Sequence, residues 1–352
     1  MKKIVLAFDS FKGCITAKEA CDAAAMGVLS VCPEATVVQM PMSDGGEGLV
    51  KCVCQIIPTQ TISIRVHGPL KEDIMAEYAL SMDGNTAYME MATASGLTLV
   101  PQDRRNPMVT TTYGVGEMIA DAVKRGCKTI IMGLGGSATC DGGRGMIMAL
   151  RDNDCLNPDC DVIAACDVSN PLFGRNGAAY IFAPQKGATP EQVALLDNHL
   201  RTFARETELA GIASPSLADY PGAGAAGGLG YALLAYLKAE LHSGIDIMLD
   251  LANFDEAIKD ADLVVTGEGK SDEQTLMGKV PHGVLRRCKK LGVPVWLLSG
   301  SIEDTSGILT KSFDFIRSIN DGDNRPISVL LQADVAKENL TKTMKNLIIK
   351  RR

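Results

Sequence analysis

The sequence predicts an α/β protein of two domains, and three observations support this class. The chain has 352 residues, which at roughly 150 residues per domain is enough for two cores. Short apolar runs alternate with helical patterns over most of the length, as in α/β folds. Short apolar runs separated by helical stretches occur near both ends of the chain, whereas between Ile62 and Met91 apolar and polar residues alternate as in a β-hairpin. We therefore expect a discontinuous domain, 1–66 plus 257–352, with a second α/β domain, 67–256, inserted into it.

The elements of the discontinuous domain can be assigned in chain order. Ile4–Phe8 is a wholly apolar run, as expected for a parallel strand that is buried on both faces. Thr16 followed by Glu19 forms a capping box that opens a helix toward Val31. The remaining strands are expected at Thr36–Met40, Asp262–Thr266, Val293–Leu298 and Phe313–Ile316, with a final helix at Ser328–Lys350.

The inserted domain begins with the hairpin and continues as an α/β pattern. We expect the hairpin strands at Ile74–Leu80 and Thr86–Met91, where apolar and polar residues alternate. Further short strands are expected at Lys128–Met132, Val162–Ala165 and Tyr180–Phe182, and a helix at Tyr231–Leu241.

Composition excludes several classes of protein. Hydrophobic residues make up 46% of the chain and charged residues 22%, which is ordinary for a globular protein and excludes a disordered one. The net charge of −7 argues against nucleic-acid or anionic-membrane partners, which require basic surfaces. Eleven scattered cysteines and four histidines favour reduced thiols over a disulfide framework or a zinc site. The first apolar run ends at Asp9, too short for a signal peptide, so we expect a soluble cytoplasmic protein.

Three loops of the discontinuous domain follow strands and should meet at one edge of its sheet. They begin at Asp9, at Gly267 and at Ser299, and two of them contain both an acid and a lysine. Ligands bind outside the carboxyl ends of strands in parallel α/β sheets. These loops are therefore expected to form a binding site, although each alone could be a simple turn.

Two glycine-rich loops lie in the inserted domain. Backbone amides at Gly135 and Gly136, with the hydroxyls of Ser137 and Thr139, could close on an anion at a helix start, and Asp141 could hold a cation there. The second loop has the G-x-G-x-x-G pattern at Gly222, Gly224 and Gly227. The dinucleotide-binding motif must follow a strand, and no strand clearly precedes this loop. Tight helix packing and phosphate binding therefore remain equally open for it.

Other familiar catalytic motifs are missing. Gly269-Lys270-Ser271 resembles the end of a P-loop, but position 264 is Val, so a Walker A motif is absent. No Gly-x-Ser-x-Gly motif occurs. His282 is the one histidine in a plausible acid–base context, although a surface role is favoured for it. Anion-binding loops, several loop carboxylates and the lysines Lys12 and Lys279 suit phosphoryl transfer. From the residues alone the sequence predicts an α/β enzyme that handles a phosphorylated anion, without naming its substrate.

A family resemblance extends this prediction. The chain resembles the bacterial type I glycerate kinases over nearly its whole length, in motifs that are specific only when taken together. These are Asp9–Gly13, Pro41–Gly48, Met91–Leu97, Thr111–Glu117, Gly135–Thr139, Asp141–Gly143, Ala165–Leu172, Pro184–Ala188, Pro221–Gly228, Ala261–Gly269, Gln274–Leu276 and Gly278–Pro281.

The resemblance implies ATP-dependent phosphorylation of D-glycerate with Mg²⁺, giving 2-phosphoglycerate in preference to 3-phosphoglycerate. It also implies two domains with a cleft between them. One of these would be Rossmann-like, with a flavodoxin-like parallel sheet, and the other is likened to restriction endonucleases. No nucleic-acid or membrane partner is implied, and the oligomeric state is left open.

Candidate site residues follow from the matched motifs. The catalytic candidates are Asp44, Asp272, Lys12 and Glu268, with Asp167 and Asp272 as metal ligands. The candidates for substrate or phosphate binding are Asp9, Ser10, Gly45, Gly46, Gly135, Gly136, Ser137, Thr139, Asp141, Gly222, Gly224, Gly227, Gly267 and Lys279. Arg65, Arg104 or Arg105 could hold the glycerate carboxylate, although a surface role is favoured for each.

The chain departs from the family pattern at a few positions, and other functions stay open. Cys14, Cys140, Lys270-Ser271 and His282 differ from the usual residues, and a lysine at 270 cannot make the bidentate contact of an arginine. The alternatives are a kinase for another small hydroxy acid, a non-catalytic sensor of a phosphorylated metabolite, and a dehydrogenase that uses Gly222–Gly227.

Overall fold

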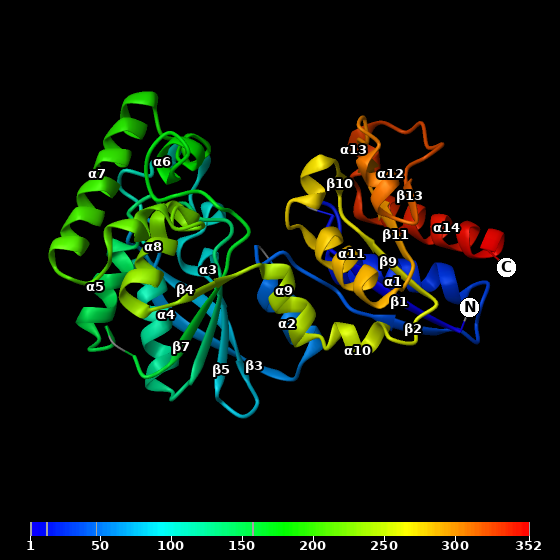
Figure 1. Cartoon of the computed structure of the whole chain (residues 1–352), viewed down its shortest axis with the longest axis horizontal. Helices are drawn as coiled ribbons and strands as arrows, with labels where there is room; N and C mark the ends of the chain where they lie inside the picture. Colours follow the sequence, from blue (N-terminus) through cyan, green and yellow to red (C-terminus); the bar gives the residue numbers. More distant parts are fainter. Residues whose placement is uncertain (1, 12, 47, 157, 352) are drawn as a thin grey trace. The chain divides into compact units, whose positions relative to one another are not determined.

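The structure is a computed structural model that describes residues 2–11, 13–46, 48–156 and 158–351. The chain forms two compact units (Figure 1), and each is described by itself. The first unit comprises Met1–Asp44, Gln55–Ile57 and Ile245–Arg352, and the second comprises Gly45–Cys54 and Pro58–Gly244.

A five-stranded parallel sheet forms the centre of the first unit. Its strand order is β13-β11-β9-β1-β2, and every neighbouring pair is parallel. A second, two-stranded parallel sheet is made of β10 and β12. The bounds are β1 Lys3–Phe8, β2 Thr36–Gln39, β9 Leu263–Gly267, β10 Lys270–Ser271, β11 Val295–Ser299, β12 Ser301–Ile302 and β13 Phe315–Ser318.

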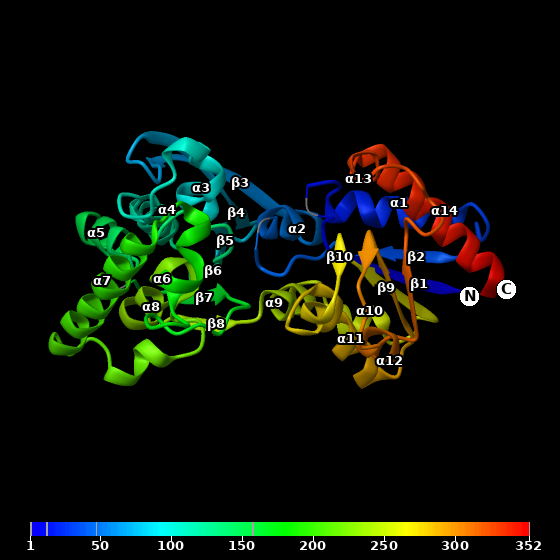
Figure 2. The ribbon, with the colours of Figure 1, turned by 90° about the horizontal axis from the view of Figure 1, so that it is seen from above.

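Helices bury both faces of β1, which explains its uninterrupted apolar sequence. Ile4, Leu6 and Phe8 belong to a core shared with α1 and α14, and these two helices lie side by side (Figure 2). Val5 and Ala7 point to the opposite face and are also fully buried, with α11 packed near this strand. The helices of this unit are α1 Ala17–Leu29, α9 Gly244–Leu251, α10 Phe254–Ile258, α11 Val280–Leu291, α12 Ile308–Ser312, α13 Ile327–Leu330 and α14 Ala333–Arg351, with a 3₁₀ turn at Glu273–Leu276.

A six-stranded mixed sheet forms the centre of the second unit, in the order β3-β4-β5-β6-β7-β8. The first three strands are antiparallel, and β5 to β8 are parallel. The bounds are β3 Thr59–His67, β4 Asp73–Ser81, β5 Thr86–Glu90, β6 Thr129–Gly133, β7 Asp161–Ala165 and β8 Glu240–His242.

The helices of the second unit pack closely through small residues. A Cβ on Gly116 would overlap the Met146 carbonyl oxygen, so this glycine allows α4 and α5 to approach each other. The helices are α2 Leu49–Ile56, whose last two residues are assigned to the first unit, α3 Ala92–Ser95, α4 Tyr113–Lys124, α5 Arg144–Asp152, α6 Ala178–Phe182, α7 Pro190–Leu209 and α8 Ala225–Leu237, with 3₁₀ turns at Leu97–Leu99, Gln102–Arg104, Pro184–Lys186 and Pro215–Asp219.

Most elements expected from the sequence are present, with three corrections. The capping box of Thr16 and Glu19 is confirmed. The apolar run Tyr180–Phe182 is not a strand but the end of α6, because its buried side is made of Ala178, Ala179 and Ala183.

The other two corrections concern helix limits. The helix expected at 231–241 begins at Ala225 and ends at Leu237, and Leu241 lies in β8. The final helix is divided into α13 and α14. The break brings Leu330 and Leu331 to the wall of a cavity that is described below.

The limits of the two units differ from those expected at 66/67 and 256/257. Strand β3, Thr59–His67, pairs along its whole length with β4, so residues 59–66 belong to the second sheet. Residues 245–256 belong to the first unit, where Arg286 binds Asp246 and Arg287 binds Asp250.

All eleven cysteines are free thiols. Among the described residues, no helix combines the length and the apolar character needed to cross a membrane.

Gly27 tests the packing of α1 on α14. In a free helix Gly→Ala adds about 1 kcal/mol of stability, but here the new Cβ would overlap the Thr341 carbonyl oxygen and lie 2.8 Å from the Cβ of Met344. We predict that Gly27→Ala lowers the free energy of unfolding by about 1–3 kcal/mol, measured by urea titration with circular dichroism. The neighbouring change Met26→Ala, at a side chain that is 60% exposed, should stay within about 0.5 kcal/mol. A stabilised Gly27→Ala variant would contradict this packing.

Candidate active site

The carboxyl edge of the parallel sheet in the first unit brings together the three predicted loops. The loop that begins at Ser299 follows β11, which pairs with β9. Asp9 follows β1 and Glu268 follows β9, and these strands are neighbours. The Asp9 amide donates to the Gly267 carbonyl at 2.9 Å, which fixes the two acids on adjacent strand ends. Both acids are buried, at 5% and 6% exposure. The predicted common edge of these loops is therefore present.

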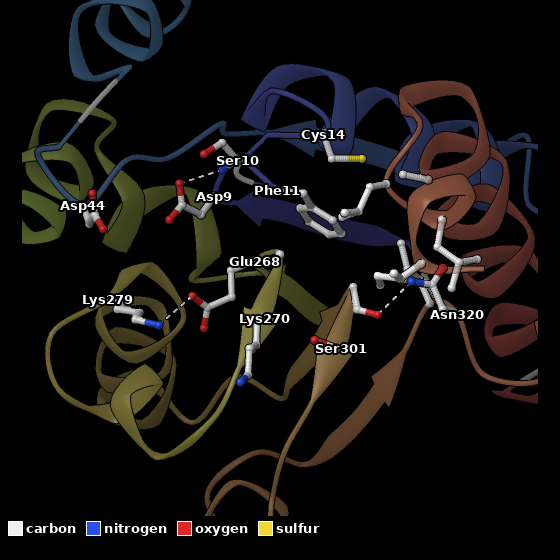
Figure 3. A pocket seen from close by; sticks show the side chains of 17 residues that line it. Asp9, Ser10, Phe11, Cys14, Asp44, Glu268, Lys270, Lys279, Ser301 and Asn320 are labelled. Atoms are coloured by element: carbon white, nitrogen blue, oxygen red, sulfur yellow. Dashed lines mark hydrogen bonds and ion pairs between the residues drawn. The ribbon is translucent and has the colours of Figure 1, made fainter. Parts of the chain in front are cut away.

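A cavity of about 340 Å³ opens at this edge within the first unit. Figure 3 shows Asp9, Asp44, Glu268 and Lys279 on one side of it and Asn320 on the other. The second side is apolar, with side chains from the β1–α1 loop, from α13 and from the start of α14. The apolar lining residues are Phe11, Ile319, Ile327, Leu330, Leu331 and Ala336.

Glu268 is held by hydroxyl groups on one oxygen and a lysine on the other. Its Oε1 accepts hydrogen bonds from Ser271 Oγ at 3.0 Å and from Thr275 Oγ1 at 2.6 Å, while Lys279 Nζ lies 3.4 Å from Oε2. Because the Ser271 hydroxyl donates to Glu268, Ser299 Oγ, at 2.7 Å, donates to Ser271. These bonds satisfy a buried carboxylate, which would otherwise be costly.

Asp272 is linked to Glu268 through Thr275. Its Oδ1 accepts from the Gln274 amide at 2.9 Å, and its own amide donates to Thr275 Oγ1 at 3.0 Å. Its Oδ2 lies 3.9 Å from Lys270 Nζ, which binds Glu303 more closely, at 2.9 Å. Asp272 therefore caps the 3₁₀ turn beside Glu268 and is not among the residues that line the cavity.

The remaining candidates in the first unit differ in position. Ser10 lines the cavity, and its amide donates to Asp9 Oδ1 at 2.6 Å. Asp44 is half-buried and also lines the cavity. Lys12 lies outside the described residues. Gly267 has a packing reason of its own, because a Cβ there would overlap the Leu298 carbonyl oxygen of the neighbouring strand β11.

The other candidates lie in the second unit. Gly45 and Gly46 precede α2, and a Cβ on Gly45 would come within 2.6 Å of the Ala165 Cβ. Asp167 follows β7, and its Oδ1 accepts from the Gly244 amide at 3.1 Å. No group of three or more His, Cys, Asp or Glu side chains that could hold a metal is found among the described residues.

The loop after β6 exposes part of its backbone. Gly136 is exposed and has a φ of +74°, and Gly135 and Ser137 are half-buried. Thr139 is fully buried, and its Oγ1 has no hydrogen-bond partner within the described ranges. Thr139 is therefore not a surface donor in this structure, in contrast to Ser137.

Asp141 bonds to its own chain at every oxygen. It accepts from the Thr112 amide and hydroxyl, at 2.9 and 2.8 Å, and from the amides of Gly143 and Gly145, at 3.0 and 3.2 Å. These four bonds join the start of α5 to the chain before α4, and they give Asp141 a structural role.

The glycines of the G-x-G-x-x-G pattern pack against backbone atoms. A Cβ would overlap the Pro171 carbonyl oxygen at Gly224 and the Thr139 carbonyl oxygen at Gly227. Gly222 has a φ of +93°, with Leu241 and Cys166 against it. A 3₁₀ turn, Pro215–Asp219, precedes the pattern in place of a strand. Close packing accounts for each of these glycines.

The structure also shows residues that the sequence prediction missed. Ser271 and Thr275 bind Glu268, and the sequence signal for the second is a threonine three positions after Asp272. Lys186 donates to Ser137, and its signal was the motif Pro184–Ala188, to which no role was given. The apolar side of the cavity formed by α13 had no local sequence signal.

Three arginines were considered for the glycerate carboxylate. Arg65 and Arg104 are exposed, and Arg105 is half-buried with an unpartnered Nε within the described chain.

The fold and the site define a two-unit α/β protein with a charged cavity at the carboxyl edge of a parallel sheet. The model of the glycerate kinase family matches residues 4–155 and 152–350. The chain belongs to this family.

Individual relatives agree with the family match. The chain is 43% identical to the glycerate 2-kinase of Escherichia coli strain K12, over 87% of each chain. It is 41% identical to a glycerate kinase of Bacillus cereus, over 98% of this chain and 97% of that protein. A crystal structure from Salmonella typhimurium LT2, of a protein assigned as glycerate kinase 2, superposes with a TM-score of 0.84 at 36% identity. It covers 99% of this chain and 98% of that chain.

Thr275 tests the hydrogen bonding of Glu268. Thr275→Val keeps the shape of the fully buried side chain but removes a donor from a buried carboxylate. We predict a loss of about 1–3 kcal/mol in unfolding free energy, measured by urea titration. The control is Thr310→Val, which removes an exposed hydroxyl bond to Asp304 and should cost less than about 1 kcal/mol. Equal losses in both variants would show that the bond to Glu268 has no special weight.

Proposed function

We propose that the protein transfers the γ-phosphoryl group of ATP to D-glycerate, with the 2-hydroxyl as the favoured acceptor. The observation that carries the proposal is the cavity of the first unit, in a member of the glycerate kinase family. One side of that cavity is charged and the other is apolar, which matches the two chemically different halves of a nucleotide.

The apolar side suits the adenine base. Phe11, Leu330 and Leu331 offer an apolar surface, and burial of a base there is favourable by about 25 cal/mol per Å². The charged side suits the phosphates, because Lys279 supplies a positive charge and Ser10 a hydroxyl donor. In phosphoryl transfer such groups act by positioning and charge neutralisation more than by covalent chemistry.

The carboxylates have two candidate roles. Asp44 or Asp272 would accept the proton of the attacking hydroxyl, which requires hydrogen-bond reach to that group. Glu268 is bound by Ser271, Thr275 and Lys279, so we propose that it orients Lys279.

Mg²⁺ fits the carboxylates that are present. The described residues contain no cluster that would hold a metal unaided, and Mg²⁺ is usually bound by one or two carboxylates together with substrate phosphates. Asp167 and Asp272, the ligands predicted from the sequence, remain the proposed ligands. The bound ion would neutralise charge on the transferred phosphoryl group.

Three other functions are weaker. A kinase for another small hydroxy acid would use the same cavity, and only substrate specificity would separate it. A sensor of a phosphorylated metabolite would not require so many carboxylates at an anion site, because carboxylates and phosphate are both negative and repel each other. A dehydrogenase has little support, because Gly222, Gly224 and Gly227 are explained by packing.

A substrate panel tests the proposed reaction. We predict ADP release from ATP with D-glycerate, abolished by EDTA and restored by Mg²⁺, and ³¹P NMR of the product should show the 2-phosphate ester. L-glycerate, lactate and tartronate serve as competing acceptors. Turnover of another acid but not of D-glycerate would reassign the substrate, and tight phosphate-ester binding without turnover would favour a sensor.

Asp44 and Asp272 test the catalytic assignment. We predict that Asp44→Asn and Asp272→Asn each lower kcat at least about a hundredfold, with unchanged circular dichroism. Asp260→Asn is the control, since its carboxylate binds Lys3 on the surface and its loss should leave kcat unchanged. Near-normal rates in both variants would remove the two acids from the mechanism.

Leu331 tests the site of the base. Leu331→Ser removes an apolar group from the cavity wall, so we predict a KM for ATP raised about five- to thirtyfold, from a loss of about 1–2 kcal/mol, with the KM for glycerate unchanged. The control Leu209→Ser changes a leucine that is 78% exposed in the second unit. An increase confined to the KM for glycerate would place the base elsewhere.

A further inference from the structure

Lys186 is a buried lysine beneath the glycine-rich loop of the second unit. It ends the 3₁₀ turn Pro184–Lys186 and is only 2% exposed. Gly187 follows with a φ of +95°, and a Cβ there would overlap the Arg105 carbonyl oxygen. The turn and this glycine therefore fix the direction in which the chain leaves Lys186.

The ammonium group of Lys186 has polar partners but no ion pair. Its Nζ donates to Ser137 Oγ and to the Thr139 carbonyl oxygen, both at 2.7 Å. Within the described residues no carboxylate oxygen lies within the 4.0 Å that defines a salt bridge to this nitrogen. Buried charges in proteins are normally paired, so an unpaired buried ammonium calls for an explanation.

The bond to Lys186 determines what Ser137 can do. An ammonium group has no lone pair, so Ser137 accepts from Lys186 and must direct its own hydroxyl proton to a different acceptor. Ser137 is half-buried, so this proton can reach a bound molecule.

The backbone beside Ser137 offers further donors. The Gly136 carbonyl accepts from the Leu97 amide at 2.8 Å, and the Ala138 amide donates to Ser95 at 2.9 Å. In the described chain no acceptor is paired with the amides of Gly135 or Gly136, which form a turn. Successive amides at a turn with one left-handed residue form a concave site for an anion.

We propose that Lys186 is the positioning residue of an oxyanion site at Gly135–Ser137. Through its hydrogen bond it orients the Ser137 hydroxyl outward, and its charge strengthens the donors of the loop. The ligand is a carboxylate or phosphate oxygen, which glycerate and ATP respectively can supply. This assignment of sources rests on the proposed function, whereas the existence of the site does not.

A purely structural role is the competing explanation. In that case Lys186 ties Ser137 and Thr139 to the 3₁₀ turn, and its removal lowers stability without a selective effect on any ligand. Binding measurements separate the two roles, because only the proposed one links the charge of Lys186 to anion affinity.

The first test compares binding by the full-length protein. Isothermal titration calorimetry is carried out with D-glycerate, with ATP and with sodium sulfate as separate ligands, on the wild type, Lys186→Met and Ser137→Ala. We expect Lys186→Met to lose at least about tenfold in affinity for sulfate and for one of the two substrates, and Ser137→Ala to lose affinity for the same ligands. The substrate that is affected identifies the source of the anion.

A matched control limits the interpretation. Lys238 also donates to two backbone carbonyls, of Ile212 and Ala235, so Lys238→Met removes a lysine of similar bonding from the same unit and should leave all three affinities unchanged. If folded Lys186→Met binds sulfate and both substrates within twofold of the wild type, the proposal is overturned. Equal losses for both substrates together with a lower melting temperature would also overturn it.

The second test uses pH on the wild type, so that it does not depend on the folding of a variant. Burial lowers the pKa of Lys186 to about 8, so the ammonium is mostly present at pH 7 and mostly lost at pH 9. The titratable groups near Lys186 are Cys140 and Asp141, with Arg105 behind Gly187. Burial raises the pKa of Cys140 to about 11, so its charge does not change over this range.

Sulfate also keeps its charge between pH 7 and pH 9. We expect sulfate affinity to fall about tenfold over this range in the wild type and to stay level in Lys186→Met. A level wild-type profile would overturn the proposal. If the wild type fails to phosphorylate D-glycerate, the proposed function fails, but the sulfate measurements still decide whether Lys186 supports an anion site.

Discussion

The pairing of β1 with β9 is the interaction on which the first unit depends. It joins Ile4–Phe8 to Leu263–Gly267 across more than half of the chain, so the second unit is a long insertion between two halves of one sheet. The entropy of closing so long a loop grows only slowly with its length, and the buried apolar faces of both strands offset it. The same pairing sets Asp9 beside Glu268, and the cavity forms around these two strand ends.

Both units stabilise a buried charge with hydroxyl and backbone groups. In the first unit Ser271 and Thr275 bind one oxygen of Glu268, and in the second Ser137 and a carbonyl bind Lys186. A neutral partner satisfies the hydrogen-bonding capacity of a charged group without cancelling its charge. The two charges differ in one respect: Lys186 has no ion pair among the described residues, whereas Glu268 also has Lys279 Nζ 3.4 Å from its Oε2.

Glycines have two structural roles in this protein, close backbone packing and exposed loop backbone, which the sequence could not separate. Of 352 residues, 35 are glycine, above the usual frequency of about 7%. At Gly224 and Gly227 the reason is contact with neighbouring backbone, whereas at Gly136 the backbone is exposed. The two glycine-rich loops look alike in sequence, because the spacing of glycines does not show which atoms pack against them.

The sequence by itself determined the capping box, the α/β class, most of the strands and the loops that carry acids and lysines, because hydrophobic periodicity and turn residues are local features. Strands β3 and β8 were not expected from it. The run Tyr180–Phe182 shows its limit, since three apolar residues fit a strand or a helix equally well. Only the tertiary structure decided that the Asp141 carboxylate accepts hydrogen bonds from its own chain, that Lys186 is buried and that α13 forms a cavity wall. Each of these depends on contacts between segments far apart in the chain, and no local pattern encodes burial of that kind.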